Sequence, residues 1–182
     1  MKRIFDILFS LIALMVFLLP VTIIVLAIKL FYEHPIIFYQ ERIGKNKKPF
    51  QILKLQTLVN DKPTKLGTIL RKTGLDELAQ FINVIKGDMS IVGPRALTAH
   101  DIERLKWDTA YHSTRWRIKP GITGFAQIFG GQHRKTSWFW DKKYTQSNSL
   151  FIDFLVISLS FLMNLFGKTK VRRMIWPNKH LN

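Results

Sequence analysis

The chain has 182 residues, a formal net charge of +16 from 28 basic and 12 acidic side chains, and no cysteine. Its length suits one domain with a real core, and a hydrophobic content of 47% excludes a disordered tail. The missing cysteine excludes disulfides, thiolate zinc sites and cysteine nucleophiles. The basic charge predicts an anionic partner, which is nucleic acid, an anionic membrane surface or a phosphorylated substrate.

The N-terminal segment predicts membrane insertion. Residues 7–28 carry no charged side chain, and about 20 apolar residues are enough to cross the hydrocarbon core of a bilayer. Lys2 and Arg3 precede this run and a strongly basic body follows it, so positive charge draws both ends toward the cytoplasm. Pro20 lies near the middle, where it removes a helix hydrogen bond and predicts a bend at Leu19 and Pro20. These residues are compatible with a re-entrant helix and with a kinked single span.

The following segment predicts a β-hairpin and then helices. Two runs rich in β-branched and aromatic residues flank the turn formers of residues 44–49, which indicates a hairpin over residues 36–58. A short basic amphipathic helix is expected over residues 63–72, and a clearer helix over residues 73–87.

The helix expected over residues 73–87 has two contrasting faces. Thr73 is its expected N-cap and Gly87 its expected C-cap. The side chains expected to face the core are Leu75, Leu78, Ile82 and Ile85. The expected polar face comprises Asp76, Gln80 and Asn83.

The remainder of the chain predicts loops and further helices. Residues 88–96 are expected to form a loop, residues 99–117 a helix, and residues 118–132 a glycine-rich loop. A second apolar run at residues 150–166 suits an interfacial helix or a core helix, and the tail after Gly167 is basic. The predicted fold class is α+β and mainly helical, with a kinked membrane helix at residues 1–33 and one compact unit at residues 34–182 that carries a β-hairpin and interfacial amphipathic helices.

Two neighbouring acids, Asp76 and Glu77, stand out in this basic chain. A carboxylate in the first turn of a helix can simply complete a capping box. For the acid pair taken alone, we favour this structural role over a functional one. Arg71 and Arg95 lie nearby in the sequence and suit phosphate oxygens. Acids among such cations indicate Mg²⁺ with a diphosphate, and a carboxylate can also attack a phosphoryl centre as a nucleophile.

At this point the chain resembles a known family. The matching stretches are "KRIFD" (2–6), "FYQERIGKNKKPFQILKLQTL" (38–58), "ILRKTGLDELAQFINVIKGDMSIVGPR" (69–95) and "IKPGITGFAQI" (118–128). Their order and spacing are similar to those of the bacterial sugar transferases called small monotopic phosphoglycosyl transferases. The resemblance covers residues 1 to about 145.

The resemblance implies a re-entrant membrane helix in the bacterial inner membrane with the catalytic unit on its cytoplasmic face. It also implies the reaction, in which a UDP-linked sugar gives its phosphosugar to a polyprenyl phosphate such as undecaprenyl phosphate, and UMP leaves. Asp76 would attack the β-phosphorus and form a covalent phosphosugar intermediate. Glu77 would be its partner, helping Asp76 to hold Mg²⁺ or deprotonating the lipid phosphate.

The resemblance further implies a set of substrate-binding residues. Lys54 and Arg71 would contact the substrate, with Arg71 at a phosphate, and Arg95 would bind phosphate or nucleotide. Pro94 would fix the backbone beside Arg95, and two glycines would shape the loop of residues 118–128. Those glycines are Gly121 and Gly124.

The sequence departs from the family pattern at four places. Leu19 stands where many members have serine before the proline, and Gln56 and Leu58 stand where members often have a basic residue and methionine. Ala96 replaces the second proline of a Pro-Arg-Pro motif, and residues 129–132 replace a stretch that usually carries asparagine and arginine. These departures motivate a second hypothesis, an inactive membrane scaffold of the same fold.

A third hypothesis, a membrane-tethered nucleic-acid binder, rests on the net charge alone. The basic residues are spread through the chain and form no recognisable nucleic-acid module. The expected partners are therefore a nucleotide-sugar donor, a polyprenyl phosphate acceptor and anionic membrane lipids, with no nucleic acid.

Overall fold

The N-terminal apolar run forms two helices that meet at an angle. In the computed structural model, which describes residues 1–31, 35–130 and 134–175, α1 (Lys2–Val16) and α2 (Leu18–Phe31) are bent by 60° relative to each other. The break lies at Phe17, rather than at the expected Leu19 and Pro20. Proline explains the offset because its ring clashes with the carbonyl four residues earlier, so Pro20 disturbs the helix one turn before itself.

The bent pair is the one stretch that combines enough length and apolarity to cross a membrane within the described ranges. No single helix there meets that requirement, and α1 and α2 meet it only together. The apolar helix α7 (Leu150–Phe166) is shorter.

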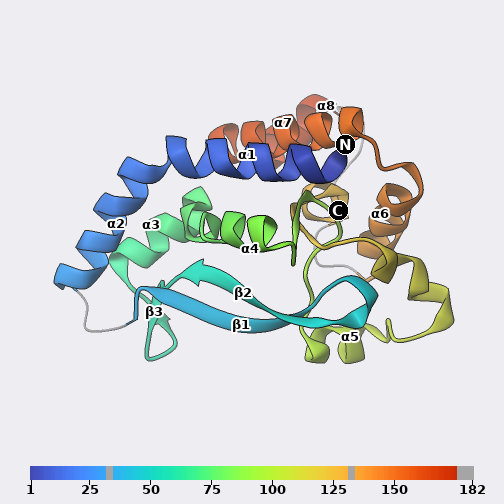
Figure 1. The fold of residues 1–182 in the computed structure, drawn as a ribbon, viewed down its shortest axis with the longest axis horizontal. Helices are drawn as coiled ribbons and strands as arrows, with labels where there is room; N and C mark the ends of the chain where they lie inside the picture. Colours follow the sequence, from blue (N-terminus) through green and yellow to red (C-terminus); the bar gives the residue numbers. More distant parts are fainter. Residues whose placement is uncertain (32–34, 131–133, 176–182) are drawn as a thin grey trace.

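The predicted hairpin is confirmed. Strand β1 (Ile37–Ile43) pairs antiparallel with β2 (Pro49–Leu55), and the short turn η1 (Lys45–Lys47) joins them. A second, very short antiparallel pair, β3 (Leu58–Val59) and β4 (Lys62–Pro63), follows directly. In Figure 1 the long hairpin forms one outer layer, with α3 and α4 next to it and α1 on the opposite side.

The region of residues 63–87 contains a helix, a tight turn and a second helix. Thr64 caps α3 (Lys65–Thr73), so Thr73 ends a helix and does not begin one, which corrects the expected N-cap. Gly74 then takes a left-handed conformation (φ +73°) that glycine adopts without strain. A 3₁₀ turn, η2 (Leu75–Glu77), holds the two acids, and α4 (Gln80–Lys86) ends at Gly87 as predicted.

The face of α4 that was predicted to be polar and outward is buried, whereas Leu78, just before the helix, is buried as predicted. Asn83 is 1% exposed, whereas Ile82 is 39% exposed. The Asn83 amide accepts from Leu53 N–H at 2.9 Å and donates to the Gln51 carbonyl at 2.7 Å, so it serves β2 as a strand neighbour would. These hydrogen bonds offset the cost of burying the amide and dock α4 on the hairpin.

Two segments predicted as loops pair with each other. Strand β5 (Ser90–Val92) lies within residues 88–96 and pairs in parallel with β6 (Gly121–Thr123). The backbones approach so closely that a Cβ at Gly121 would lie 2.1 Å from the Gly93 nitrogen. Glycine spacing therefore reflects strand packing, a tertiary requirement that a single sequence does not reveal.

The predicted helix of residues 99–117 is two elements. Helix α5 (Ala99–Leu105) begins at a capping box on Thr98 and stops where Lys106 is left-handed, and the 3₁₀ segment η3 (Ala110–Arg117) follows. The remaining elements are the π-helical turn η4 (Ala126–Gly130) and the helices α6 (Arg134–Ser147), α7 and α8 (Lys168–Ile175). Residues 131–132 of the predicted glycine-rich loop lie outside the described residues.

Charged side chains tie the start of α1 to the rest of the molecule. Lys2 pairs with the fully buried Asp153 of α7 at 2.5 Å, and Asp6 accepts from the Ser90 hydroxyl and the Ile91 N–H of β5. Arg3 donates to the last carbonyls of α4. The helix is therefore docked by its polar end onto the domain that holds the two acids.

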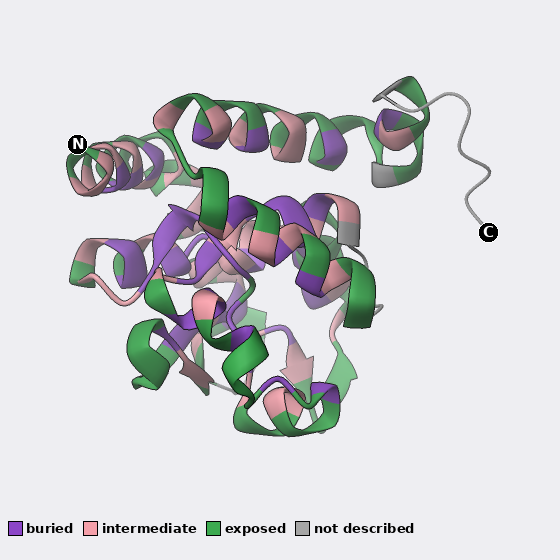
Figure 2. Cartoon of the chain, turned by 90° about the vertical axis from the view of Figure 1, so that its right-hand side faces the viewer, coloured by how far each residue is buried: buried purple, intermediate pink, exposed green. Residues whose placement is uncertain are grey.

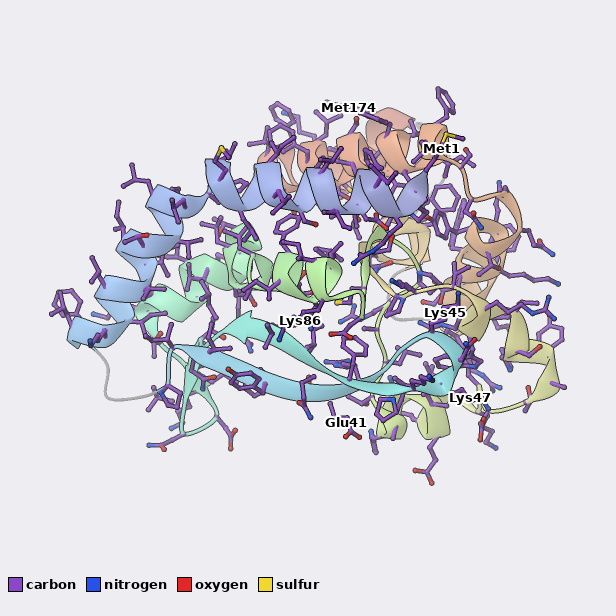
Figure 3. All side chains as sticks on the ribbon, in the orientation of Figure 1. Met1, Glu41, Lys45, Lys47, Lys86 and Met174 are labelled. Atoms are coloured by element: carbon purple, nitrogen blue, oxygen red, sulfur yellow. The ribbon has the colours of Figure 1, made fainter. Side chains whose placement is uncertain are left out.

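The outer side of the helical layer is exposed (Figure 2), and on α1, α2 and α7 many of its exposed side chains are apolar. Met1 and Met174 mark this outer side in Figure 3. Its exposed side chains include Ile4, Leu8, Ile12, Met15, Leu19, Phe151, Phe154, Phe161 and Leu165. Exposed apolar surface of this extent marks a surface that contacts another apolar phase.

Candidate active site

The two neighbouring acids lie in the turn η2, between α3 and α4. Asp76 is 8% exposed, and Glu77 is more open, with a side chain that is 39% exposed. Burial, followed by the negative charge of Glu77, raises the pKa of the Asp76 carboxyl, while Lys54 and Arg71 partly oppose the rise. No cation lies within ion-pair distance of Asp76 among the described residues. Asp76 is thus a buried carboxylate without a direct partner of opposite charge.

Two adjoining cavities meet at these acids. The larger, of about 510 Å³, includes Glu77 in its wall, and the smaller, of about 440 Å³, includes Asp76. Arg42 and Lys54 line both cavities, so the two cavities adjoin at these residues. The two acids of one turn therefore line two neighbouring cavities.

Cations predicted from the sequence gather around the acids. Lys54 of β2 forms a 2.6 Å ion pair with Glu77, and Arg71 of α3 lines the smaller cavity, where its Nε donates to Thr57 at 2.9 Å. Arg95 lines the larger cavity. These three cations outnumber the two acids, so the site as a whole is suited to an anion with more than one negative charge.

Arg42 is a site residue that the sequence reasoning missed. It donates to the Ala96 carbonyl at 3.0 Å and lies 3.6 Å from Asp101. Burial lowers the pKa of its guanidinium, with Asp101 opposing the effect and Arg95 adding to it, yet arginine stays charged at neutral pH.

The alternation of side chains along β1 could have identified Arg42 as a site residue. Phe38, Gln40 and Arg42 are spaced two apart and share one face of β1, and Lys54 lies directly across from Phe38 in the hairpin. All four side chains line the smaller cavity. Glu41, on the other face, points away from α4 (Figure 3).

The remaining predicted residues shape the site. Gly121 lines the larger cavity, but its N–H donates to the Pro94 carbonyl at 2.9 Å and is not available to a phosphate. A Cβ at Gly124 would lie 2.1 Å from the Gly93 carbonyl oxygen. Pro94 is fully buried behind the cavity wall. These three residues hold β5 and β6 together below Arg95.

The larger cavity also has an apolar side. Its wall includes Phe9 of α1, Phe17 at the break between α1 and α2, Phe81 of α4, and Ile157 and Phe161 of α7. A single cavity therefore connects the charged floor at Glu77 to the exposed apolar layer of the molecule.

Gln56, Leu58 and Ala96 depart from the family pattern and line the two cavities, whereas Leu19 lies on α2. Gln56 lines the smaller cavity and donates to the Leu58 carbonyl at 2.7 Å. Ala96 lines the larger cavity, and its carbonyl holds Arg42. Within residues 129–132, Gly131 and Gln132 lie outside the described residues.

The acids suit a divalent cation that is shared with a substrate. The described residues contain no cluster of three or more His, Cys, Asp or Glu side chains that could hold a metal by themselves. Mg²⁺ commonly takes only one or two carboxylates and completes its shell with water and phosphate oxygens. A cation would also neutralise the charge of Glu77 that, after burial, raises the pKa of Asp76. The residues present therefore fit Mg²⁺ together with a diphosphate.

A family model and three individual relatives that match this chain are all named as sugar or sugar-phosphate transferases. The model of the family described as bacterial sugar transferase matches residues 1–167. The chain is 32% identical to the uncharacterized sugar transferase EpsL of Bacillus subtilis, over 88% of this chain and 85% of that protein. It is 33% identical to the UDP-glucose:undecaprenyl-phosphate glucose-1-phosphate transferase of Escherichia coli, over 92% of this chain and 41% of that protein.

A third relative differs in its named sugar. The UDP-N-acetylgalactosamine-undecaprenyl-phosphate N-acetylgalactosaminephosphotransferase of Aeromonas hydrophila is 30% identical over 86% of this chain and 41% of that protein. The chain thus spans about four-tenths of the length of these last two relatives and most of the length of the first. With its site geometry and the match over residues 1–167, this chain belongs to the bacterial sugar transferase family.

Proposed function

We propose that this chain transfers a phosphosugar from a UDP-linked sugar to undecaprenyl phosphate and releases UMP. The observation that carries the proposal is the position of Asp76, a buried carboxylate with a raised pKa in the wall of a cavity lined by cations. The names of the relatives, which specify UDP-sugars and undecaprenyl phosphate, support the choice of donor and acceptor.

The proposed reaction has two displacements at one phosphorus atom. An Asp76 carboxylate oxygen attacks the phosphorus that bears the sugar, and the bond from that phosphorus to the bridging oxygen breaks, with its electron pair leaving on UMP. A phosphate oxygen of the polyprenyl phosphate then attacks the same phosphorus and releases Asp76. The products are UMP and a lipid diphosphosugar.

The neighbouring residues have distinct roles in this scheme. Arg42, Lys54, Arg71 and Arg95 hold the phosphate oxygens and offset their charge. Glu77, held by Lys54, accepts a proton from the acceptor phosphate when that phosphate is monoprotonated. Asp76 and Glu77 would hold Mg²⁺, which would supply further neutralisation of the diphosphate charge.

The apolar side of the larger cavity supports a lipid acceptor. A polyprenyl tail would lie along Phe9, Phe17 and Phe161, while its phosphate reaches the charged floor. The bent pair α1–α2 and the exposed apolar layer would anchor the chain in the bacterial inner membrane as a re-entrant helix, with the acids and a basic surface at its cytoplasmic face.

The test is intact-protein mass spectrometry of the chain in nanodiscs, with Mg²⁺ and a panel of UDP-sugars but no lipid acceptor. We expect an adduct of phosphosugar mass with one donor, its loss on adding undecaprenyl phosphate, and no adduct in Asp76→Asn. Ser147→Ala, at an exposed position on α6, is the matched control and should form the adduct. The absence of both adduct and UMP release with every donor and acceptor present would favour the inactive scaffold.

A further inference from the structure

A third cavity, of about 220 Å³, lies beyond Arg95. Arg95 lines both this cavity and the larger one at the acids, so the two adjoin at that guanidinium. The other charged residues of its wall are Asp101, Arg104, Arg115 and Asp141. None of these four residues is needed for the phosphoryl chemistry described above.

The wall of this third cavity is rigidly built. Arg115 and Asp141 are each 2% exposed and form a 2.8 Å ion pair. Arg115 also donates to the Arg95 carbonyl, so the pair holds the backbone of the residue that joins the two cavities. A buried pair of this kind is costly to disturb, because removing one partner leaves an uncompensated charge.

Trp107 supplies an unused hydrogen-bond donor in the same wall. The residue is 1% exposed, lines the third cavity, and its indole N–H has no partner among the residues that the structure describes. His112 stacks on the indole ring with centroids 5.7 Å apart, and the Arg115 guanidinium lies over the ring at 5.4 Å. The Trp107 N–H is therefore a buried donor in this wall that no described protein group satisfies. A buried donor without a partner is costly unless a ligand or water satisfies it.

The order of the cavities indicates what this ligand is. Asp76 lines the smaller cavity. Lys54 and Arg42 line both the smaller and the larger cavity, and Arg95 lines both the larger and the third cavity. In phosphoryl transfer the leaving group departs roughly opposite the attacking oxygen. A nucleotide whose phosphates lie between Asp76 and Arg95 would place its nucleoside in the third cavity.

We infer that the third cavity binds the nucleoside end of the donor. Trp107 N–H and the Arg104 guanidinium would donate to carbonyl or hydroxyl oxygens of the nucleoside, and the Asp101 carboxylate would accept from ribose hydroxyls. This inference rests on the proposed function, because it assumes that the donor is a nucleoside diphosphate sugar. It assigns the selection of the nucleotide to residues 101–115 and separates it from the acids.

The first test measures UMP binding to the full chain in nanodiscs by calorimetry. Trp107→Phe removes the N–H and keeps an aromatic ring, and we expect it to weaken UMP binding about 10-fold, as for loss of one buried hydrogen bond. Trp138→Phe is the matched control, since its indole N–H is also buried and unpartnered but Trp138 does not line this cavity. The control should bind UMP as the unmodified chain does.

The second test uses an exposed position, where folding is not at risk. The Arg104 side chain is 59% exposed at the rim, and Arg104→Ala should also weaken UMP binding, whereas Arg173→Ala on α8 should not. Unmodified UMP binding in both Trp107→Phe and Arg104→Ala would overturn the inference, and phosphosugar adduct formation would show that the proposed function stands. A chain that binds no UMP and forms no adduct with any donor would overturn both.

Discussion

The protonation of Asp76 sets the lower pH limit of the proposed reaction. Only the carboxylate can attack phosphorus, so activity should fall as the pH drops through the pKa of Asp76. Burial and Glu77 raise this pKa, and Lys54 and, to a smaller extent, Arg71 lower it. The position of the acid limb of the pH–rate profile therefore reports the charges around the nucleophile.

Replacing Lys54 should move that acid limb to higher pH. Lys54→Met removes the larger of the two cationic contributions that lower the pKa of Asp76, so the limb should shift upward, and by more than in Arg71→Met. The measurement is kcat/KM for UMP release as a function of pH. Lys65→Met, an exposed lysine at the start of α3, is the control and should leave the limb in place. A shift to lower pH in Lys54→Met would contradict the role given to Asp76.

At the scale of elements, a buried amide decides how α4 docks. Asn83 satisfies one N–H and one carbonyl of β2, although an amphipathic reading of the helix places this residue outside. The two acids precede α4 by a few residues, so the docking of α4 on the hairpin also sets the distance between Glu77 and Lys54.

Two substitutions on α4 should separate the faces of that helix. Asn83→Ala leaves a buried N–H and a part-buried carbonyl of β2 unpaired and should cost on the order of 3 kcal/mol in the free energy of unfolding. Ile82→Ala, one residue earlier and 39% exposed, should cost much less. Thermal unfolding of both variants in the same detergent provides the comparison. An equal loss of stability in the two variants would contradict the observed orientation.

At the scale of the whole molecule, the polar start of α1 determines where the N-terminus lies. Lys2, Arg3 and Asp6 are bonded to α7, α4 and β5, and the same body carries Asp76. A helix held in this way cannot place its N-terminus across a membrane from the acids without breaking these contacts. The contacts therefore favour a bent helix that enters and leaves by one face.

Thiol labelling should place both ends of the bent pair on one side. The chain has no cysteine, so a single cysteine added before Met1 or introduced as Lys62→Cys can be labelled without background. We expect an impermeant reagent to label both positions in inside-out vesicles and neither in intact spheroplasts. Labelling of the N-terminal cysteine in spheroplasts alone would show that the bent pair spans the membrane. Solubilised protein, in which both sites are open, serves as the reference.

The sequence by itself determined the elements and residues whose signals are local. Turn chemistry between β-rich runs identified the hairpin, Gly87 identified the end of α4, and an acid pair in a basic chain identified Asp76 and Glu77. Each of these signals depends on neighbours within a few residues, and resemblance then attached a family to them. The family model that matches residues 1–167 confirms that family.

Only the tertiary structure decided the features that depend on distant partners. The inward orientation of Asn83 depends on β2, and the pairing of β5 with β6 depends on glycines almost thirty residues apart. Arg42 joined the site because the hairpin brings it to the same face as Lys54. The sequence pattern shows which residues are polar. Whether a polar residue is buried depends on the hydrogen-bond partners and charges that the fold places beside it.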